Sequence, residues 1–146
     1  MTALGRCLLD AAVFIYAVGA DHPCRDPCRR LLDPDHLGAY GGEASVQAIQ
    51  ELLHQRARRT GDRAGAAATA RAAAGLCPLH ELTEADLSLG LRLFGAVPQL
   101  SGRDALHAAT ALNRDIGTII SPDAAFDDVP GLQRLDPVEA AELLPG

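Results

Sequence analysis

Lysine and tryptophan are both missing from the sequence, and so is any excess of positive charge. All 13 basic residues are arginines, and the 19 acidic residues leave a formal net charge of -6. This balance argues against a simple non-specific nucleic-acid binder, which presents a net positive surface. Arginine binds phosphate through a planar fork of N–H donors, so an anion site in this chain would be built from such forks.

Long hydrophobic runs are lacking too, because charges interrupt each apolar segment within about ten residues, short of a bilayer span. The N-terminal run contains Asp10, a carboxylate that does not fit the apolar region of a signal peptide, so we expect a cytoplasmic protein. Four cysteines are too few for a disulfide scaffold. Cys24 and Cys28 lie near His22, but no second ligand pair follows, so free thiols are favoured over a zinc site.

The length of 146 residues is typical of one domain, which we expect to span residues 1–146 around one hydrophobic core. Strand-like and helical segments alternate, which predicts an α/β sandwich around a mostly parallel sheet. Strands or extended segments are expected at 6–10, 36–40, 78–82, 117–121 and 131–135. Helices are expected at 12–18, 23–32, 44–59, 63–74, from 83, at 101–112 and from 137.

The 44–59 segment has the clearest amphipathic pattern. Val46, Ile49, Leu53 and Ala57 recur at helical spacing, which predicts that this face is apolar and packs on the core. Glu51 falls on the other side, so periodicity alone predicts that its carboxylate is solvated.

Three aspartates lie where α/β proteins form sites, beyond the carboxyl ends of strands. Asp10 ends the first strand, Asp123 lies two residues past the 117–121 strand, and Asp104 is in the first turn of the 101–112 helix. Each has a structural alternative as well. Asp10 and Asp104 suit a helix N-terminus, and Asp123 suits a turn after Pro122.

Converging carboxylates repel one another unless a cation compensates, and Mg2+ and Mn2+ prefer such oxygen ligands. A divalent metal held in this way activates water and binds phosphodiester oxygens. No nucleophile elbow, P-loop or glycine-rich dinucleotide loop competes with this interpretation. A haloacid-dehalogenase-type phosphatase also has Asp at the end of its first strand, but it needs a second Asp where this chain has Ala12.

Four segments carry a family resemblance: LLDAAVFIYA around Asp10, SVQAIQELLHQ around Glu51, GRDALHAATAL around Asp104 and TIISPDAAFDDVPGL around Asp123. In this order and at these separations, they resemble the PIN domain, and more closely the VapC-type toxins of bacterial toxin–antitoxin pairs. The resemblance covers nearly the whole chain. It implies a PIN-like α/β/α sandwich, a Mg2+- or Mn2+-dependent endoribonuclease, a VapB-type antitoxin partner and a homodimer.

The resemblance also implies roles for single residues. Asp10, Asp104 and Asp123 would be catalytic metal ligands, directly or through water, and Glu51 would complete the acidic pocket by binding a metal or orienting its water. Water activated by the metal would attack the RNA phosphodiester without a covalent enzyme intermediate. Ser121 matches a small hydroxyl residue of the family motif and is expected to hydrogen-bond a site carboxylate.

Two positions depart from the family pattern. Ala12 stands where the family usually has Asn, Ser or Thr, and Ala125 stands where many relatives carry a further acid. Fewer polar side chains than usual are therefore available to orient the metal ligands. Asp127 and Asp128 are not expected to replace the missing acid. The alternative function is a PIN-like RNA- or protein-binding module whose turnover is weakened or lost.

RNA contacts are expected from Arg103 and from the basic cluster at 56–63, chiefly from Arg56 and Arg59. The alternative for the cluster is a solvated helix end whose charge suits the helix dipole. His107, one turn beyond Asp104, is expected to pack or hydrogen-bond rather than to catalyse. Aromatic residues form only 3% of the chain, so we expect little base stacking on side chains.

Overall fold

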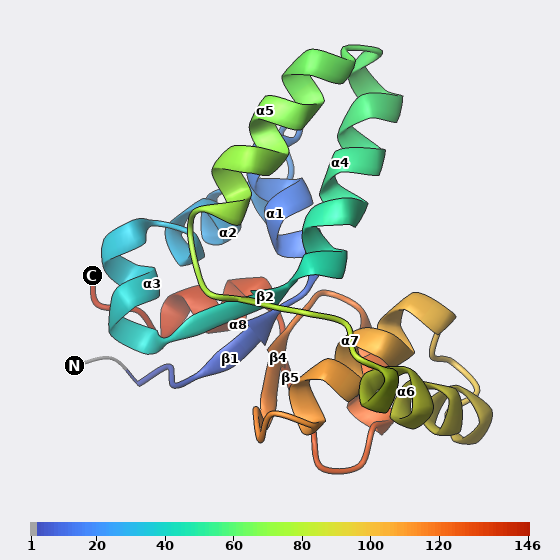
Figure 1. The fold of residues 1–146 in the computed structure, drawn as a ribbon. Helices are drawn as coiled ribbons and strands as arrows, with labels where there is room; N and C mark the ends of the chain where they lie inside the picture. Colours follow the sequence, from blue (N-terminus) through green and yellow to red (C-terminus); the bar gives the residue numbers. More distant parts are fainter. Residues whose placement is uncertain (1–2) are drawn as a thin grey trace.

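Five parallel strands form the central sheet of the computed structural model, which describes residues 3–146 (Figure 1). The order across the sheet is β3-β2-β1-β4-β5, and each neighbouring pair is parallel. The strands are β1 Cys7–Leu9, β2 Gly42–Ser45, β3 Leu79–His80, β4 Thr118–Ile120 and β5 Gln133–Leu135. The predicted α/β fold with a parallel sheet is thereby confirmed.

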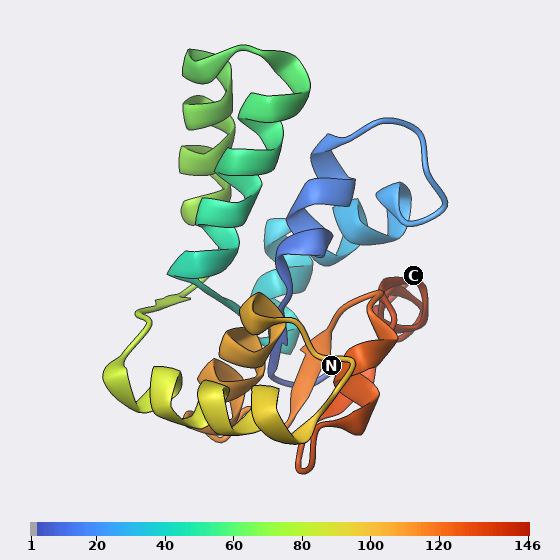
Figure 2. The same ribbon diagram turned by 90° about the vertical axis from the view of Figure 1, so that its right-hand side faces the viewer.

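Helices cover both faces of the sheet, with the α4–α5 hairpin on one side and α6 and α7 on the other (Figure 1, Figure 2). No helix in residues 3–146 combines the length and the hydropathy needed to cross a membrane. The helices are α1 Ala11–Val18, α2 Arg25–Leu31, α3 Pro34–Tyr40, α4 Val46–Thr60, α5 Arg63–Ala74, α6 Glu84–Ala96, α7 Gly102–Leu112, the 3-10 helix η1 Ala124–Asp128 and α8 Pro137–Glu142.

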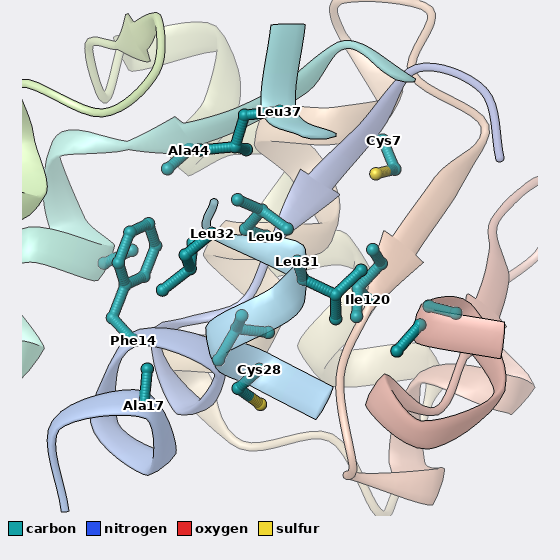
Figure 3. Close-up of a cluster of buried hydrophobic side chains, with 14 of the residues drawn as sticks. Cys7, Leu9, Phe14, Ala17, Cys28, Leu31, Leu32, Leu37, Ala44 and Ile120 are labelled. Carbon is teal, nitrogen blue, oxygen red and sulfur yellow. The ribbon is translucent and has the colours of Figure 1, made fainter. Parts of the chain in front are cut away.

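Strand β1 lies at the centre of the sheet, and its side chains enter two different hydrophobic cores. Cys7 and Leu9 join the core beneath α1, α2 and α4 (Figure 3). Leu8 points the opposite way, to the core that contains Phe126 and one face of α7. Side chains alternate along a strand, so a strand covered on both faces must be apolar at every position. This explains the unbroken apolar run that leads to Asp10.

The strand expected at 36–40 is wrong, because residues Pro34–Tyr40 form helix α3 and strand β2 follows them. The Asp33 carboxylate accepts a hydrogen bond from the Asp35 N–H at 3.0 Å, which caps the helix. Pro34 occupies its first turn, and Gly41 ends it in the left-handed conformation with φ at 83°. Asp-Pro before the segment and Gly after it are helix start and stop signals, and they outweigh local strand propensity.

Helix α4 begins later than expected and turns a different face to the core. Its first residue is Val46, because Ser45 belongs to β2 and caps the helix by accepting the Ala48 N–H at 3.1 Å. Val46 and Leu53 are 49% and 38% exposed, whereas Ala48 and Leu52 are fully buried, so the predicted buried face is wrong at Val46 and Leu53. Ile49 is partly buried and packs against the core, as predicted. The helix packs against both α1 and α5, and two partners overrule the single apolar stripe that periodicity shows.

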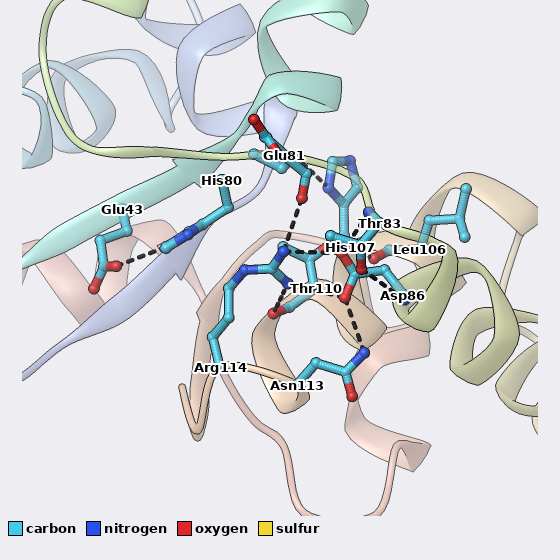
Figure 4. A network of polar contacts seen from close by, with 11 residues as sticks. Glu43, His80, Glu81, Thr83, Asp86, Leu106, His107, Thr110, Asn113 and Arg114 are labelled. Carbon is cyan, nitrogen blue, oxygen red and sulfur yellow. Dashed lines mark hydrogen bonds and ion pairs between the residues drawn. The ribbon is translucent and has the colours of Figure 1, made fainter.

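Helices α6 and α7 are joined by a buried ion pair (Figure 4). Asp86 is fully buried, and Arg114 donates to both of its oxygens at 2.9 Å. Asn113 donates to the same carboxylate at 2.9 Å. Burial by itself would raise the pKa of Asp86, but these hydrogen bonds and those from Thr83 hold it below its ordinary value. The network fixes α7, the helix that carries Asp104.

Candidate active site

A cavity of about 710 Å³ opens at the carboxyl ends of the central strands. Four acidic residues line it: Asp10 directly after β1, Glu51 on α4, Asp104 in the first turn of α7 and Asp123 shortly after β4. The structure thus brings together the four carboxylates that the sequence and the family resemblance selected. Their role as metal ligands stays a prediction.

Asp10 is buried, and its neighbours orient it for the cavity. Its side chain makes no capping bond to α1, so the structural alternative of a helix cap does not describe it. The Ser121 hydroxyl donates to Asp10 Oδ2 at 2.7 Å and accepts the Asp123 N–H at 3.0 Å. Burial raises the pKa of Asp10 despite the opposing effects of His107 and Ser121. Ser121 therefore makes the contact with a site carboxylate that was expected of it.

His107 lies beneath the cavity, fully buried. Its Nε2 is 3.3 Å from Glu51 Oε1 and 3.9 Å from Asp10 Oδ1, and its Nδ1 is 3.3 Å from Ser45 Oγ. Burial lowers the pKa of His107, but the hydrogen bond to Glu51 and the nearby carboxylate charges outweigh that effect and raise it. The imidazole therefore hydrogen-bonds a site residue, as expected.

Asp104 and Asp123 face each other at the mouth of the cavity. Asp104 is half-buried, and its N–H is capped by Ser101 Oγ at 3.1 Å. Burial, the charge of Asp10 and the hydrogen bond and charge of Asp123 raise the pKa of Asp104 to about 7. Asp123 is exposed, and its Oδ1 accepts the Ala125 N–H at 2.9 Å. Asp123 therefore stabilises the turn after Pro122 and also lines the cavity.

Of the accessory positions that the sequence singled out, Asp127 and Ala125 lie apart from the cavity, and Ala12 lines it. Asp127 is held by Arg134, whose Nε donates to its Oδ1 at 2.9 Å. Ala125 is buried in the core beside α7, where its methyl group packs among apolar side chains. Ala12 lines the cavity with a methyl group. The positions that depart from the family pattern therefore add no polar side chain to this site.

The residues of the cavity fit a hard divalent cation. Carboxylate oxygens are the ligands that such cations prefer, and the burial and carboxylate repulsion that raise the pKa of Asp104 are effects that a bound cation would offset. Ligand atoms of Asp10, Glu51 and His107 lie within 4.8 Å of one another, and the described residues contain no second group of this kind. Periodicity missed Glu51, and only the family resemblance signalled it.

Three arginines line the acidic cavity: Arg58, Arg59 and Arg103. All three are exposed, and none of their guanidinium groups forms a hydrogen bond or ion pair with another described residue. Arg56 points elsewhere, donating to the Val18 carbonyl at 3.0 Å. His54 and Gln55 also line the cavity, although no sequence signal singled them out. Unpaired guanidinium groups around a carboxylate pocket can hold phosphates on either side of it.

The raised pKa of Asp104 predicts a stability cost at neutral pH. Its native pKa of about 7 exceeds the unfolded value of about 3.9, so the native state binds more protons and loses stability as pH rises between the two. Without metal, Asp104→Asn should melt at a higher temperature than the parent protein at pH 7.5 and lose this advantage near pH 4. Thermal unfolding in EDTA measures this, and equal melting temperatures at pH 7.5 would contradict it.

The family model of the PIN domain matches residues 7–132 of this chain. Ribonuclease VapC7 from Mycobacterium tuberculosis is 39% identical over 124 residues, which cover 84% of this chain and 85% of that protein. Ribonuclease VapC13 from the same organism is 30% identical, with coverage of 88% and 98%. The DNA-bound VapBC structure from Salmonella typhimurium aligns with a TM-score of 0.71 at 12% identity, covering 92% of this chain and 99% of that one. This last likeness concerns the fold alone.

Proposed function

The chain belongs to the PIN-domain family, and from this membership we propose its function. It is an endoribonuclease that hydrolyses RNA phosphodiesters and acts as the toxin of a type II toxin–antitoxin pair. It depends on a divalent cation, Mg2+ or Mn2+. Its inhibitor is a VapB-type antitoxin, a partner that the likeness to VapBC supports. We further propose one PIN domain over residues 1–146, a homodimer, and action in the cytoplasm on RNA.

The observation that carries the proposal is the acidic cavity with its rim of unpaired arginines. Four carboxylates from separate parts of the chain converge there, and burial together with the neighbouring carboxylate charges raises the pKa values of Asp10 and Asp104. Such crowding destabilises the free protein, and a bound cation compensates it. Arginines beside the carboxylates supply the sites for a polyanionic substrate.

In the proposed mechanism, Asp10, Asp104 and Asp123 would hold the cation, and Glu51 would complete the pocket. A bound cation would neutralise the carboxylates and supply Lewis-acid activation of water and of the phosphodiester. Ser121 keeps Asp10 and the Asp123 loop at a fixed separation through its two hydrogen bonds.

His107 and the arginines have supporting roles in this mechanism. His107 orients the Glu51 carboxylate from inside the core. Arg58, Arg59 and Arg103 bind the flanking phosphates, which places the scissile bond over the carboxylates.

Cleavage of total cellular RNA by the purified protein tests the function directly. We expect cleavage with Mg2+ or Mn2+, none with EDTA, and inhibition by an antitoxin encoded beside the toxin. Cleavage that persists unchanged in EDTA would refute the metal dependence. No cleavage under either metal would refute the ribonuclease assignment.

A PIN-like binding module without turnover is the second candidate. The methyl group of Ala12 in the cavity favours it, since a polar side chain at this position would support metal ligands. Calorimetric titration separates the two candidates. Binding of Mg2+ or Mn2+ at millimolar concentration supports the enzyme, and absence of binding supports the module.

Ser121→Ala should lower cleavage activity about 10- to 100-fold, because the hydroxyl joins two predicted metal ligands. The loss should appear as weaker metal affinity, so higher Mn2+ concentrations should restore part of the rate. Ser88→Ala is the matched control, since Ser88 is exposed on α6 and its hydroxyl accepts a hydrogen bond from Arg92, away from the cavity. An unchanged metal dependence in Ser121→Ala would show that the hydroxyl does not position these carboxylates.

A further inference from the structure

A second cavity, of about 170 Å³, lies directly beside the acidic one. Ile15, Gln55 and Arg59 line both, so the two cavities share a wall. The rest of the second cavity comes mainly from the end of α1 and the loop that joins it to α2, the blue loop in Figure 2. A polymer that crosses the acidic cavity can therefore place its neighbouring unit in the second one.

Two of the few aromatic rings in the chain meet in this second cavity. Tyr16 and His22 stack with their ring centroids 4.4 Å apart and their planes inclined by 23°. Tyr16 is half-buried, and His22 is exposed. The Cys24 N–H donates to His22 Nδ1 at 3.0 Å, which fixes the orientation of the imidazole. A supported ring with an exposed side is a platform on which a planar group can stack.

Charge is distributed unevenly around the second cavity. Arg59 lines both cavities, and its guanidinium group has no hydrogen-bond partner among the described residues. Asp21 lines only the second cavity, where its Oδ1 accepts from Arg25 at 3.3 Å. A phosphate is therefore attracted to the shared wall and repelled from the Asp21 wall. The anchored Arg56, bonded to the Val18 carbonyl, holds the end of α1 in place.

We propose that this second cavity binds the base of the nucleotide next to the scissile phosphate. The base stacks on His22, which Tyr16 supports, and the phosphate of the same nucleotide contacts Arg59. The cavity is smaller than the roughly 300–1,000 Å³ of a pocket for a whole ligand, and thus suits one ring system. The inference rests on the ribonuclease function proposed above. It revises the expectation of little base stacking, because two scarce rings gather beside the proposed reaction site.

An RNA occupant is favoured over a segment of a protein partner by the shared wall. Stacking rings and guanidinium groups along one path are the combination that binds single-stranded nucleic acid. The path leads straight to the four carboxylates, which a phosphodiester must reach for hydrolysis.

The proposal is tested by a double-mutant cycle that removes the His22 ring from the protein and single bases from the RNA, separately and together. The parent protein first defines a cleaved bond in RNA. The Asp104→Asn variant then binds short single-stranded RNAs spanning that bond, in which each nucleotide in turn lacks its base, and fluorescence anisotropy measures the dissociation constants. We expect one position beside the bond to lose about five-fold or more in affinity when its base is removed.

In Asp104→Asn/His22→Ala, the intact RNA should bind more weakly by a similar factor, and removal of that base should have no further effect. Tyr16→Leu should reproduce the loss, and Tyr16→Phe should not, because it keeps the ring. His36→Ala is the matched control, since His36 lines neither cavity. Circular dichroism of each variant separates lost binding from lost folding.

Three outcomes overturn the proposal. The effect of base removal could be the same with and without the His22 ring, which would exclude stacking there. His22→Ala could leave RNA binding unchanged and weaken only binding of the antitoxin, which would assign the cavity to the protein partner. A parent protein that cleaves no RNA with either metal would refute the proposed function and this inference with it, whereas the first two outcomes leave the ribonuclease function standing.

Discussion

Asp104→Asn is expected to lower kcat/KM for RNA cleavage by more than about 100-fold, beyond the loss typical of a residue that only supports a metal ligand. The amide keeps the size of the side chain but removes the negative charge that a divalent cation needs. Asp10→Asn should lower kcat/KM at least as much. The Asp10 carboxylate is buried beside other site residues, where bulk water cannot take its place as a metal ligand. Initial rates of cleavage and calorimetric titration with Mn2+ measure both effects.

Asp128→Asn is the matched control for these two variants. Asp128 is exposed at the end of η1, and its carboxylate forms no hydrogen bond with another described residue, so the activity of the variant should stay within about two-fold of the parent. Unfolding does not account for the loss in Asp104→Asn, because this variant is expected to be the more stable one in EDTA. Full activity in both Asp10→Asn and Asp104→Asn would remove the acidic cavity from the mechanism.

Arg114→Met is expected to lower the free energy of unfolding by about 3–5 kcal/mol, since it leaves the buried Asp86 carboxylate without its cation. Because the native pKa of Asp86 lies below its unfolded value, the pair stabilises the protein above about pH 4 and loses this effect as pH falls further. The difference in the free energy of unfolding between the variant and the parent should therefore be smaller at low pH. Urea unfolding at pH 7 and pH 3 measures it.

Arg92→Met controls for the loss of one arginine on the same pair of helices. Arg92 donates only to the Ser88 hydroxyl at 3.1 Å, so its removal should change stability by less than about 0.5 kcal/mol. The double variant Asp86→Leu/Arg114→Met should recover part of the loss, because no unpaired charge remains buried. If Arg114→Met unfolded at the same urea concentration as the parent, the ion pair would not stabilise the α6–α7 unit.

Sequence and structure agree best where the local signals of a segment do not conflict with one another. The apolar runs of β1 and β4 are buried on both faces, and carboxylates follow them as predicted. The two clear errors, at 36–40 and on α4, arise where signals conflict. Helix caps overrode strand propensity in α3, and packing against two helices overrode the single apolar stripe of α4.

The sequence by itself determined the α/β alternation, the caps of several helices and the placing of Asp10, Asp104 and Asp123 near strand ends or a helix start. These features depend on neighbours within a few residues, which a linear pattern records. Only the tertiary structure decided that Glu51 faces inward, that His107 meets it at 3.3 Å, and that Tyr16 and His22 stack beside the acidic cavity. Such contacts depend on how the helices pack across the sheet and on the path of the loop after α1. The hydrophobic periodicity of one helix does not show which other elements it packs against.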